Sequence, residues 1–175
     1  MNFDALFDSL PSDGWLSRAE AELLWRTVQR DTGPILEVGC YQGRSTVLLA
    51  ASGRQVHSVD PFDNFNTELS GAEVRRRWTA NMESRGIANV TLHVMPVELW
   101  SVVPVVTAYL DGDHTARGTI AQLNAALRAG ATRIMVHDVN DSGEGKAIKR
   151  ICLNRLGPWE ERVERLAVWS LSSTG

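Results

Sequence analysis

Short runs of β-branched and aliphatic residues alternate with helix-like segments along most of this chain. The runs cover residues 35–38, 56–59, 90–94, 105–110 and 132–137. In the segments between them, apolar residues recur every three or four positions, as they do on one face of an amphipathic helix. Strands that alternate with helices of about 10–15 residues form βαβ units. The pattern therefore predicts an α/β fold with a doubly wound, mostly parallel sheet and helices on both of its faces.

The two ends of the chain depart from this alternation. Over the first thirty residues, the capping-box spacing of Ser17 and Glu20 and the apolar residues that follow predict helix, which a Thr-Gly-Pro sequence ends at residues 32–34. Residues 159–172 are typical of a C-terminal antiparallel hairpin. No repeat or linker divides the chain, so a single domain over residues 1–175 is expected. Its parts are an N-terminal helical cover over residues 1–33 and a core over residues 34–175.

Composition and charge exclude several classes of protein. Of the 175 residues, 43% are hydrophobic and 22% charged, which suits one globular domain and excludes a disordered or fibrous protein. The net charge of −3 argues against a nucleic acid partner. The most apolar stretch, residues 97–110, is too short and interrupted to span a membrane, and residues 1–4 lack the start of a secretory signal. Two cysteines are too few for a disulfide framework, so a cytoplasmic protein without membrane contact is expected.

A glycine-containing turn follows the first predicted strand. In folds of this class, ligands bind beyond the carboxyl ends of the strands. Gly39 can adopt a positive φ or let a ligand approach the backbone, and Gly43 opens the following helix, whose N-terminus suits an anionic group. For these glycines alone, a plain strand–turn–helix joint is an equally good explanation.

Asp60 ends the second predicted strand and follows Gly39 by 21 positions. This is close to the offset of about 20 residues at which an acidic side chain binds ribose hydroxyls in nucleotide-binding folds. An aspartate that merely caps a surface turn is the alternative. The third glycine of the dinucleotide-binding motif is absent, which favours a nucleoside cofactor without a diphosphate.

Four acidic or imidazole groups follow the last two parallel strands. Asp111 and Asp138 stand at adjacent strand ends, where two carboxylates can bind one Mg²⁺ ion. His114 is near enough to Asp111 to act as a base, and His137 as a third ligand would shift the preference toward Mn²⁺. Turn-forming aspartates and a core histidine are the alternative, but four such groups at one sheet edge favour a site.

Four segments together carry a resemblance to a known family: ILEVGCYQGRSTVLLA at residues 35–50, HSVDPF at 57–62, YLDGDHTARG at 109–118 and VHDV at 136–139. They resemble class I S-adenosylmethionine-dependent methyltransferases, in particular the metal-dependent small-molecule and sugar O-methyltransferases related to macrocin O-methyltransferase and the cephalosporin-cluster enzymes. The resemblance runs from about residue 14 to residue 169. It implies a Rossmann-like fold and methyl transfer from S-adenosylmethionine to a hydroxyl of a sugar, a glycoside or a catechol-like molecule, assisted by Mg²⁺ or Mn²⁺.

The resemblance also implies roles for individual residues. The cofactor would contact Glu37 and Gly39 at its methionine end, Cys40, Tyr41, Gly43 and Ser45 around the same loop, Asp60 and Pro61 at the ribose, and Met95 and Pro96 at the adenine. The metal ligands would be Asp111, Asp138 and His137, with His114 as the base and Asp111 as the second catalytic residue. His137 stands where members of this group often carry Glu or Asp.

Two alternatives stay open at this point. The glycine loop and Asp60 would also suit an NAD(P)-dependent oxidoreductase, although no Tyr-x-x-x-Lys pair occurs. A compact chain leaves little room for an acceptor pocket, so a non-catalytic S-adenosylmethionine-binding domain is the other alternative. In an enzyme, residues 63–71 and the amino-terminal helix with Trp15 would cover the acceptor. This cover is short, so it must be small or be completed by another subunit of a homo-oligomer.

Overall fold

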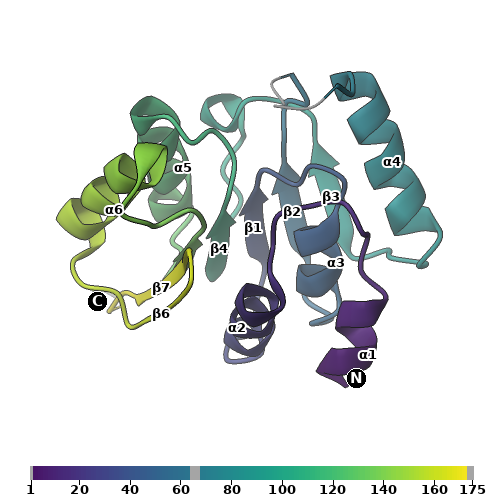
Figure 1. Ribbon diagram of the computed structural model, residues 1–175, viewed down its shortest axis with the longest axis horizontal. Helices are drawn as coiled ribbons and strands as arrows, with labels where there is room; N and C mark the ends of the chain where they lie inside the picture. The colour runs from purple at the N-terminus through teal and green to yellow at the C-terminus, as the bar shows by residue number, and fades with distance from the viewer. Residues whose placement is uncertain (1, 64–67, 173–175) are drawn as a thin grey trace.

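Within the residues that the computed structural model describes, 2–63 and 68–172, seven strands form one sheet (Figure 1). The five parallel strands are β1 (Ile35–Val38), β2 (Val56–Val59), β3 (Val90–His93), β4 (Thr107–Leu110) and β5 (Arg133–Val136). The antiparallel hairpin of β6 (Glu161–Val163) and β7 (Leu166–Ser170) joins β5, which gives the order β3-β2-β1-β4-β5-β7-β6. The predicted doubly wound sheet and C-terminal hairpin are confirmed.

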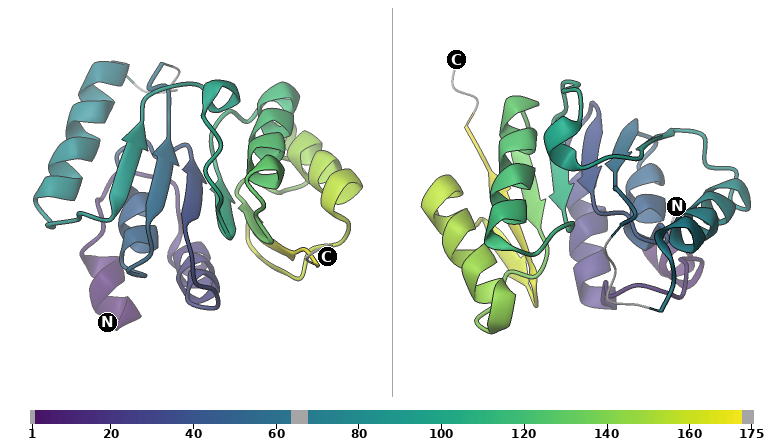
Figure 2. Two further views of the ribbon diagram at one scale, coloured as in Figure 1. Left: turned by 180° about the vertical axis from the view of Figure 1, so that it is seen from behind. Right: turned by 90° about the horizontal axis from the view of Figure 1, so that it is seen from above.

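Helices cover both faces of this sheet (Figure 2). One layer contains α1 (Phe3–Asp8), α2 (Arg18–Val28), α3 (Arg44–Ala50) and α4 (Gly71–Glu83). The other contains α5 (Ala116–Arg128), α6 (Gly143–Leu156) and a short 3₁₀ helix, Val97–Leu99. Side chains such as Leu23 and Val74 form the apolar cluster under the first layer, and side chains such as Leu123 and Ile148 form the cluster under the second. None of the described helices is long and apolar enough to cross a membrane.

The amino-terminal cover consists of two helices and not of one continuous helix. Residues 9–17 separate α1 from α2, and they contain Pro11 and Gly14, which disfavour helix. Ser17 then begins α2 with a complete capping box, in which the Glu20 carboxylate accepts a hydrogen bond of 3.0 Å from the Ser17 backbone N–H. The capping box is therefore confirmed. Trp15 lies in the connecting segment and not on a helix, contrary to the prediction.

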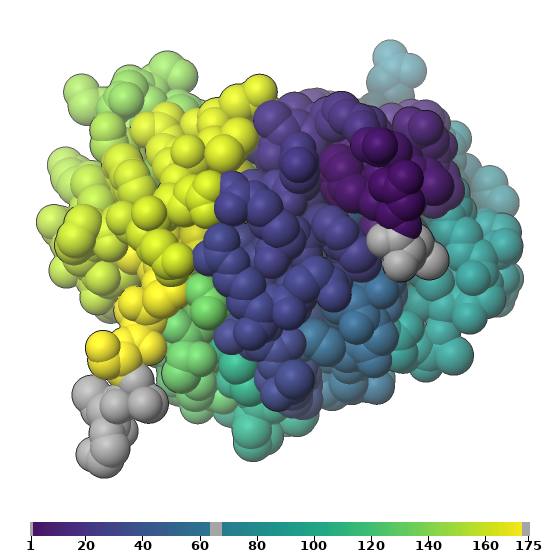
Figure 3. Space-filling model, turned by 90° about the horizontal axis from the view of Figure 1, so that it is seen from below, coloured from purple at the N-terminus to yellow at the C-terminus, as the bar shows by residue number. Residues whose placement is uncertain are grey.

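The amino-terminal cover lies beside the C-terminal hairpin, from which it is distant in sequence. Figure 3 shows the purple and blue N-terminal residues next to the yellow hairpin. Arg26 of α2 forms an ion pair with Glu161, and Arg30 Nη1 lies 3.0 Å from Glu160 Oε1. The packing brings the first turn of α2 to the carboxyl end of β5.

Three predicted strands are shorter in the structure. The run predicted over residues 90–94 ends at His93, the run over 105–110 begins at Thr107, and the run over 132–137 is reduced to Arg133–Val136. Beyond β5, Asp138 adopts a φ of 57°, and this left-handed conformation turns the chain out of the sheet. The shortened strand leaves His137 and Asp138 at the sheet edge.

Candidate active site

A cavity of about 910 Å³ opens at the carboxyl ends of the parallel strands. The loops that follow β1, β2, β4 and β5 all contribute to its wall, with Gly39, Asp60, Asp111 and Asp138 respectively. These four loops therefore share one rim of the cavity. The volume falls within the range of about 300–1,000 Å³ that is usual for small-molecule sites.

Gly39 and Gly43 in the loop after β1 have different roles. Gly39 has a φ of 82°, and a Cβ atom added to it would lie 2.4 Å from the carbonyl oxygen of Asp111. Only glycine therefore fits where the loops after β1 and β4 meet at the cavity wall. Gly43, with a φ of 94°, precedes α3 and packs so closely on Met82 that an added Cβ would lie 2.6 Å from its Cε. Gly43 does not line the cavity, and its predicted contact with a cofactor has no support in the geometry.

Asp60 holds the loop after β1 through backbone hydrogen bonds. Its Oδ2 accepts from the N–H groups of Cys40 at 2.9 Å and Tyr41 at 3.1 Å, and its Oδ1 accepts from Phe62 N at 2.8 Å. Burial raises the pKa of Asp60 above its usual value, while these N–H groups act in the opposite direction. The Cys40 thiol also contacts this carboxylate, and Asp60 lines the cavity, where a ligand hydroxyl can approach it.

Most of the other predicted cofactor residues line the cavity, and one of them packs against the apolar core instead. Five of them line the cavity: Cys40, Tyr41, Ser45, Pro61 and Pro96. Met95 instead packs against the apolar cluster under α5, so its predicted place beside a ligand is not supported. The 3₁₀ helix after Pro96 adds Val97 and Glu98 to the wall, and no sequence motif indicated these two residues.

Glu37 supports the cavity wall from behind instead of reaching the cavity. Its fully buried carboxylate accepts hydrogen bonds from the hydroxyls of Ser45 at 2.7 Å, Thr46 at 2.8 Å and Ser58 at 2.5 Å. Burial raises the pKa of Glu37 to about 7, because the three hydroxyls only partly offset the loss of solvation. The predicted contact of Glu37 with a cofactor is therefore replaced by a structural role: it fixes the start of α3 against β1 and β2.

The raised pKa of Glu37 predicts a specific pH dependence of stability. In the unfolded chain this carboxyl has its usual value of about 4.5, so between pH 4.5 and 7 the unfolded state loses a proton that the folded state retains. The contribution of Glu37 to the free energy of unfolding should therefore fall over this interval, by up to about 3 kcal/mol, and stay constant above it. In urea titrations, the difference in free energy of unfolding between the wild type and Glu37→Gln should change by this amount between pH 4.5 and 7. Parallel curves for the two proteins would contradict the assignment.

Asp111, His114 and Asp138 converge at the other end of the cavity. His114 Nε2 lies 3.5 Å from Asp111 Oδ1 and 3.4 Å from Asp138 Oδ2, and it is buried without a hydrogen bond. Burial would raise the pKa of Asp111, but the charges and hydrogen bonds of His137 and His114 hold it below its usual range. One ligand atom from each of the three residues lies within 4.8 Å of the others. Two carboxylates and an unpaired imidazole nitrogen fit a divalent cation, and the mixed donors suit Mn²⁺.

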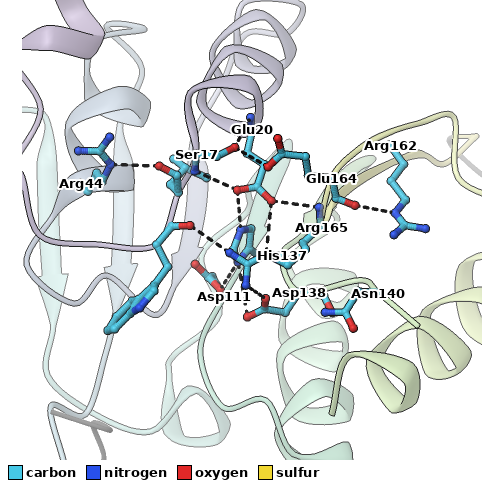
Figure 4. Close-up of polar contacts among 12 residues, drawn as sticks. Ser17, Glu20, Arg44, Asp111, His137, Asp138, Asn140, Arg162, Glu164 and Arg165 are labelled. Atoms are coloured by element: carbon cyan, nitrogen blue, oxygen red, sulfur yellow. Dashed lines mark hydrogen bonds and ion pairs between the residues drawn. The ribbon is translucent and has the colours of Figure 1, made fainter. Parts of the chain in front are cut away.

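His137 is part of this cluster, but it is not placed as a metal ligand. Its ring lies between carboxylates: Nδ1 is 3.1 Å from Asp111 Oδ1 and 3.6 Å from Asp138 Oδ2, and Nε2 is 3.3 Å from Glu20 Oε2 (Figure 4). Burial lowers the pKa of His137, but the three carboxylates outweigh it and raise the pKa to about 12. Each ring nitrogen therefore faces a carboxylate, and the three residues whose ligand atoms converge are Asp111, His114 and Asp138, without His137. The predicted ligand role of His137 has no support in this geometry.

Glu20 and Arg165 also contact the cluster, although neither was predicted as a site residue. Arg165, in the turn between β6 and β7, places Nη1 3.0 Å from Asp138 Oδ1, and its backbone N–H donates to Glu20 Oε1 at 3.0 Å (Figure 4). The only sequence signal for Glu20 was its spacing from Ser17. Neither contact could be inferred without knowing that α2 and the hairpin meet.

The family model of a methyltransferase domain matches residues 36–139 of this chain, which is more than half of its length. The chain belongs to this methyltransferase family. The match begins in β1 and ends just after Asp138, so it includes all four loops that form the cavity rim. It confirms the predicted methyltransferase and removes the support for a nicotinamide-dependent oxidoreductase. Comparison with curated proteins by sequence gives no match.

Solved structures show the same fold in distant methyltransferases and related proteins. Cofactor-bound Rv0187 from MTB has 18% identity and a TM-score of 0.69, over 97% of this chain and 87% of the other. CalS11, a TDP-rhamnose 3'-O-methyltransferase of calicheamicin biosynthesis, has 18% identity and a TM-score of 0.62, over 97% and 91%. The O-methyltransferase TomG from Streptomyces achromogenes, solved with S-adenosylmethionine, has 14% identity and a TM-score of 0.66, over 97% and 90%. At these identities the comparisons establish the shared fold.

Proposed function

We propose that this methyltransferase transfers a methyl group from S-adenosylmethionine to a hydroxyl group of a small molecule. The observation that carries the proposal is that one cavity contains both the loop held by Asp60 and the cluster of Asp111, His114 and Asp138. The first can bind a nucleoside, and the second can activate a hydroxyl. The structures of TomG and CalS11 support the proposal, because both are described as O-methyltransferases with this fold.

The cofactor would lie along the loops after β1, β2 and β3. Gly39 and Tyr41 line the cavity wall, and Gly39 has no side chain that would obstruct the cofactor. Asp60 lines the same wall, where its carboxylate would accept a hydrogen bond from a ribose hydroxyl. Pro96 lines the wall after β3, where the adenine would lie. Bound in this way, the cofactor would direct its sulfonium group toward the loops after β4 and β5.

His114 would take the proton of the acceptor hydroxyl. In the transfer, the acceptor oxygen forms a bond to the methyl carbon, the bond from that carbon to sulfur breaks, and its electron pair stays on the sulfur of S-adenosylhomocysteine. The hydroxyl proton passes to Nε2 of His114. The Asp111 carboxylate, 3.5 Å from Nε2, raises the pKa of His114 against the effect of burial, so the imidazole is a stronger base than a free histidine.

A divalent cation also fits the cluster. Asp111 and Asp138 would hold the ion, and His114 Nε2 is close enough to be the third ligand. When bound, the ion would lower the pKa of an acceptor hydroxyl. A ligated His114 has no lone pair for the proton, so the two roles of His114 exclude each other and can be separated by experiment.

Treatment with EDTA should lower turnover by at least about tenfold, and added Mn²⁺ should restore it, if the cluster holds a cation. The affinity for S-adenosylhomocysteine, measured by calorimetry, should stay unchanged, because the Asp60 loop lies outside the cluster. Full turnover in EDTA would exclude the cation and assign proton removal to His114 alone.

The function itself is tested by binding first and by transfer second. Calorimetry should detect S-adenosylmethionine and S-adenosylhomocysteine, with NAD as a control that does not bind. Mass spectrometry should then detect a gain of one methyl group on at least one member of a panel of catechols, sugars and glycosides. Failure to bind either sulfur compound would refute the proposal, and binding without transfer across the panel would favour a non-catalytic S-adenosylmethionine-binding domain.

A further inference from the structure

We propose that Glu20 of α2 is a positioning residue for the reaction, which acts through His137 on the two carboxylates Asp111 and Asp138. The inference rests on the proposed function and adds a residue from outside the segment that matches the family model. Its basis is a continuous line of side-chain contacts from the amino-terminal cover to the cavity (Figure 4).

The burial of Glu20 is not explained by its role in the helix cap. A capping glutamate works as well when it is exposed to solvent, whereas Glu20 has no exposed surface. A carboxylate in the protein interior is unfavourable unless charged or hydrogen-bonding groups surround it. Here the surrounding groups are the backbone N–H groups of Ser17 and Arg165, each at 3.0 Å, the His137 ring at 3.3 Å and Arg165 Nε at 3.8 Å. Of the two charged side chains that face the Glu20 carboxylate, His137 is the nearer, and it is buried as Glu20 is.

His137 in turn determines how the two aspartates face the cavity. Asp111 and Asp138 follow neighbouring strands, and two carboxylates so close together repel each other. The His137 ring, 3% exposed, stands between them with Nδ1 directed at both. The contact with Glu20 at the opposite side of the ring prevents it from turning away. The two remaining oxygens are also held, because Asp111 Oδ2 accepts a hydrogen bond from the Tyr109 hydroxyl and Asp138 Oδ1 accepts one from Arg165 Nη1, each at 3.0 Å.

The same contacts attach the amino-terminal cover to the site. Residues 14–16, which precede α2, line the cavity, and Arg165 Nη2 donates to the carbonyl oxygen of Trp15 at 3.2 Å. Arg44 at the start of α3 holds the same segment, because its Nε donates to the carbonyl oxygen of Leu16 at 3.3 Å. The cover and the cluster therefore form one rigid arrangement, with Glu20 at their junction.

The test compares Glu20→Gln with Glu22→Gln, the same substitution at an exposed position two residues along the helix. We expect Glu20→Gln to lower kcat by about 10–100-fold, the usual effect of losing a partner of an active-site ligand. The KM for S-adenosylmethionine and the affinity for S-adenosylhomocysteine should stay within about twofold of the wild type, because Glu20 does not contact the Asp60 loop. Glu22→Gln should leave all three quantities unchanged. An unchanged kcat in Glu20→Gln would overturn the inference.

A double-mutant cycle with His137→Gln separates positioning from general destabilisation. If Glu20 acts through His137, the double variant should have the kcat of His137→Gln alone. If the fold-loss of kcat in the double variant equals the product of the losses in the two single variants, the inference is overturned. If Glu20→Gln does not fold, Glu20→Asp replaces it in the cycle with the same two outcomes. A wild type that transfers no methyl group would refute the proposed function, whereas an active wild type with an equally active Glu20→Gln would refute this inference alone.

Discussion

His114→Ala should lower methyl transfer at neutral pH by about 10²–10⁴-fold, the range expected when a positioned acid or base is removed. The effect should be this large because the described part of the cavity wall offers no other imidazole for the role: His137 is enclosed between Glu20 and the two aspartates. Affinity for S-adenosylhomocysteine should not change, since His114 follows β4 whereas Asp60 follows β2, and β1 lies between these two strands. Initial rates and calorimetry on the same samples measure both quantities.

His93→Ala is the matched control for this prediction. His93 lies on β3, outside the cavity, and its Nε2 pairs with His57 Nδ1 at 3.2 Å. The substitution removes an imidazole without touching the site, so the control should retain turnover. Turnover of His114→Ala equal to that of the control would exclude His114 both as the base and as a required ligand.

Asp60→Ala should weaken binding of S-adenosylmethionine and S-adenosylhomocysteine by at least about 100-fold. The carboxylate holds the N–H groups of Cys40, Tyr41 and Phe62, and each hydrogen bond to a charged group contributes about 1.5–3 kcal/mol. The substitution removes the support of the loop and also the acceptor for the ribose. Calorimetry with S-adenosylhomocysteine measures the loss directly.

Two further variants give this second experiment its controls. Asp63→Ala removes an exposed carboxylate three residues later on the same cavity wall, and it should bind nearly as tightly as the wild type. Asp60→Asn keeps the size of the side chain but offers fewer acceptor positions, so its affinity should lie between those of the wild type and Asp60→Ala. An Asp60→Ala protein that is folded, as judged by circular dichroism, and binds within about threefold of the wild type would contradict the assignment.

The parts of the site that directly follow the parallel strands could be predicted from the sequence. In a parallel sheet, the loops after the carboxyl ends of the strands meet at one edge, so the spacing of Gly39, Asp60 and Asp111 was enough to bring them together. The role of Glu37 could not be predicted in this way. Both faces of β1 are buried, and the sequence motif does not indicate which face leads to the cavity.

The environment of His137 depended on long-range packing and could not be predicted. Its partner Glu20 comes from α2, and Arg165 comes from the hairpin, so only the assembled fold brings them together. The sequence showed His137 beside Asp138, which favoured a shared metal. The predicted acceptor cover over residues 63–71 lies partly outside the described residues. The single domain, the homo-oligomer and the cytoplasmic location stay predictions.

The contact between Glu20 and Arg165 joins residues 145 positions apart, which has a consequence for the synthesis of the protein. Contacts of such long range form late, because the intervening chain must first be made and compacted. A nascent chain in which β5 has just left the ribosome already exposes every parallel strand of the sheet, but it exposes no hairpin against which α2 can dock. The hairpin must therefore also leave the ribosome before Glu20 can meet Arg165.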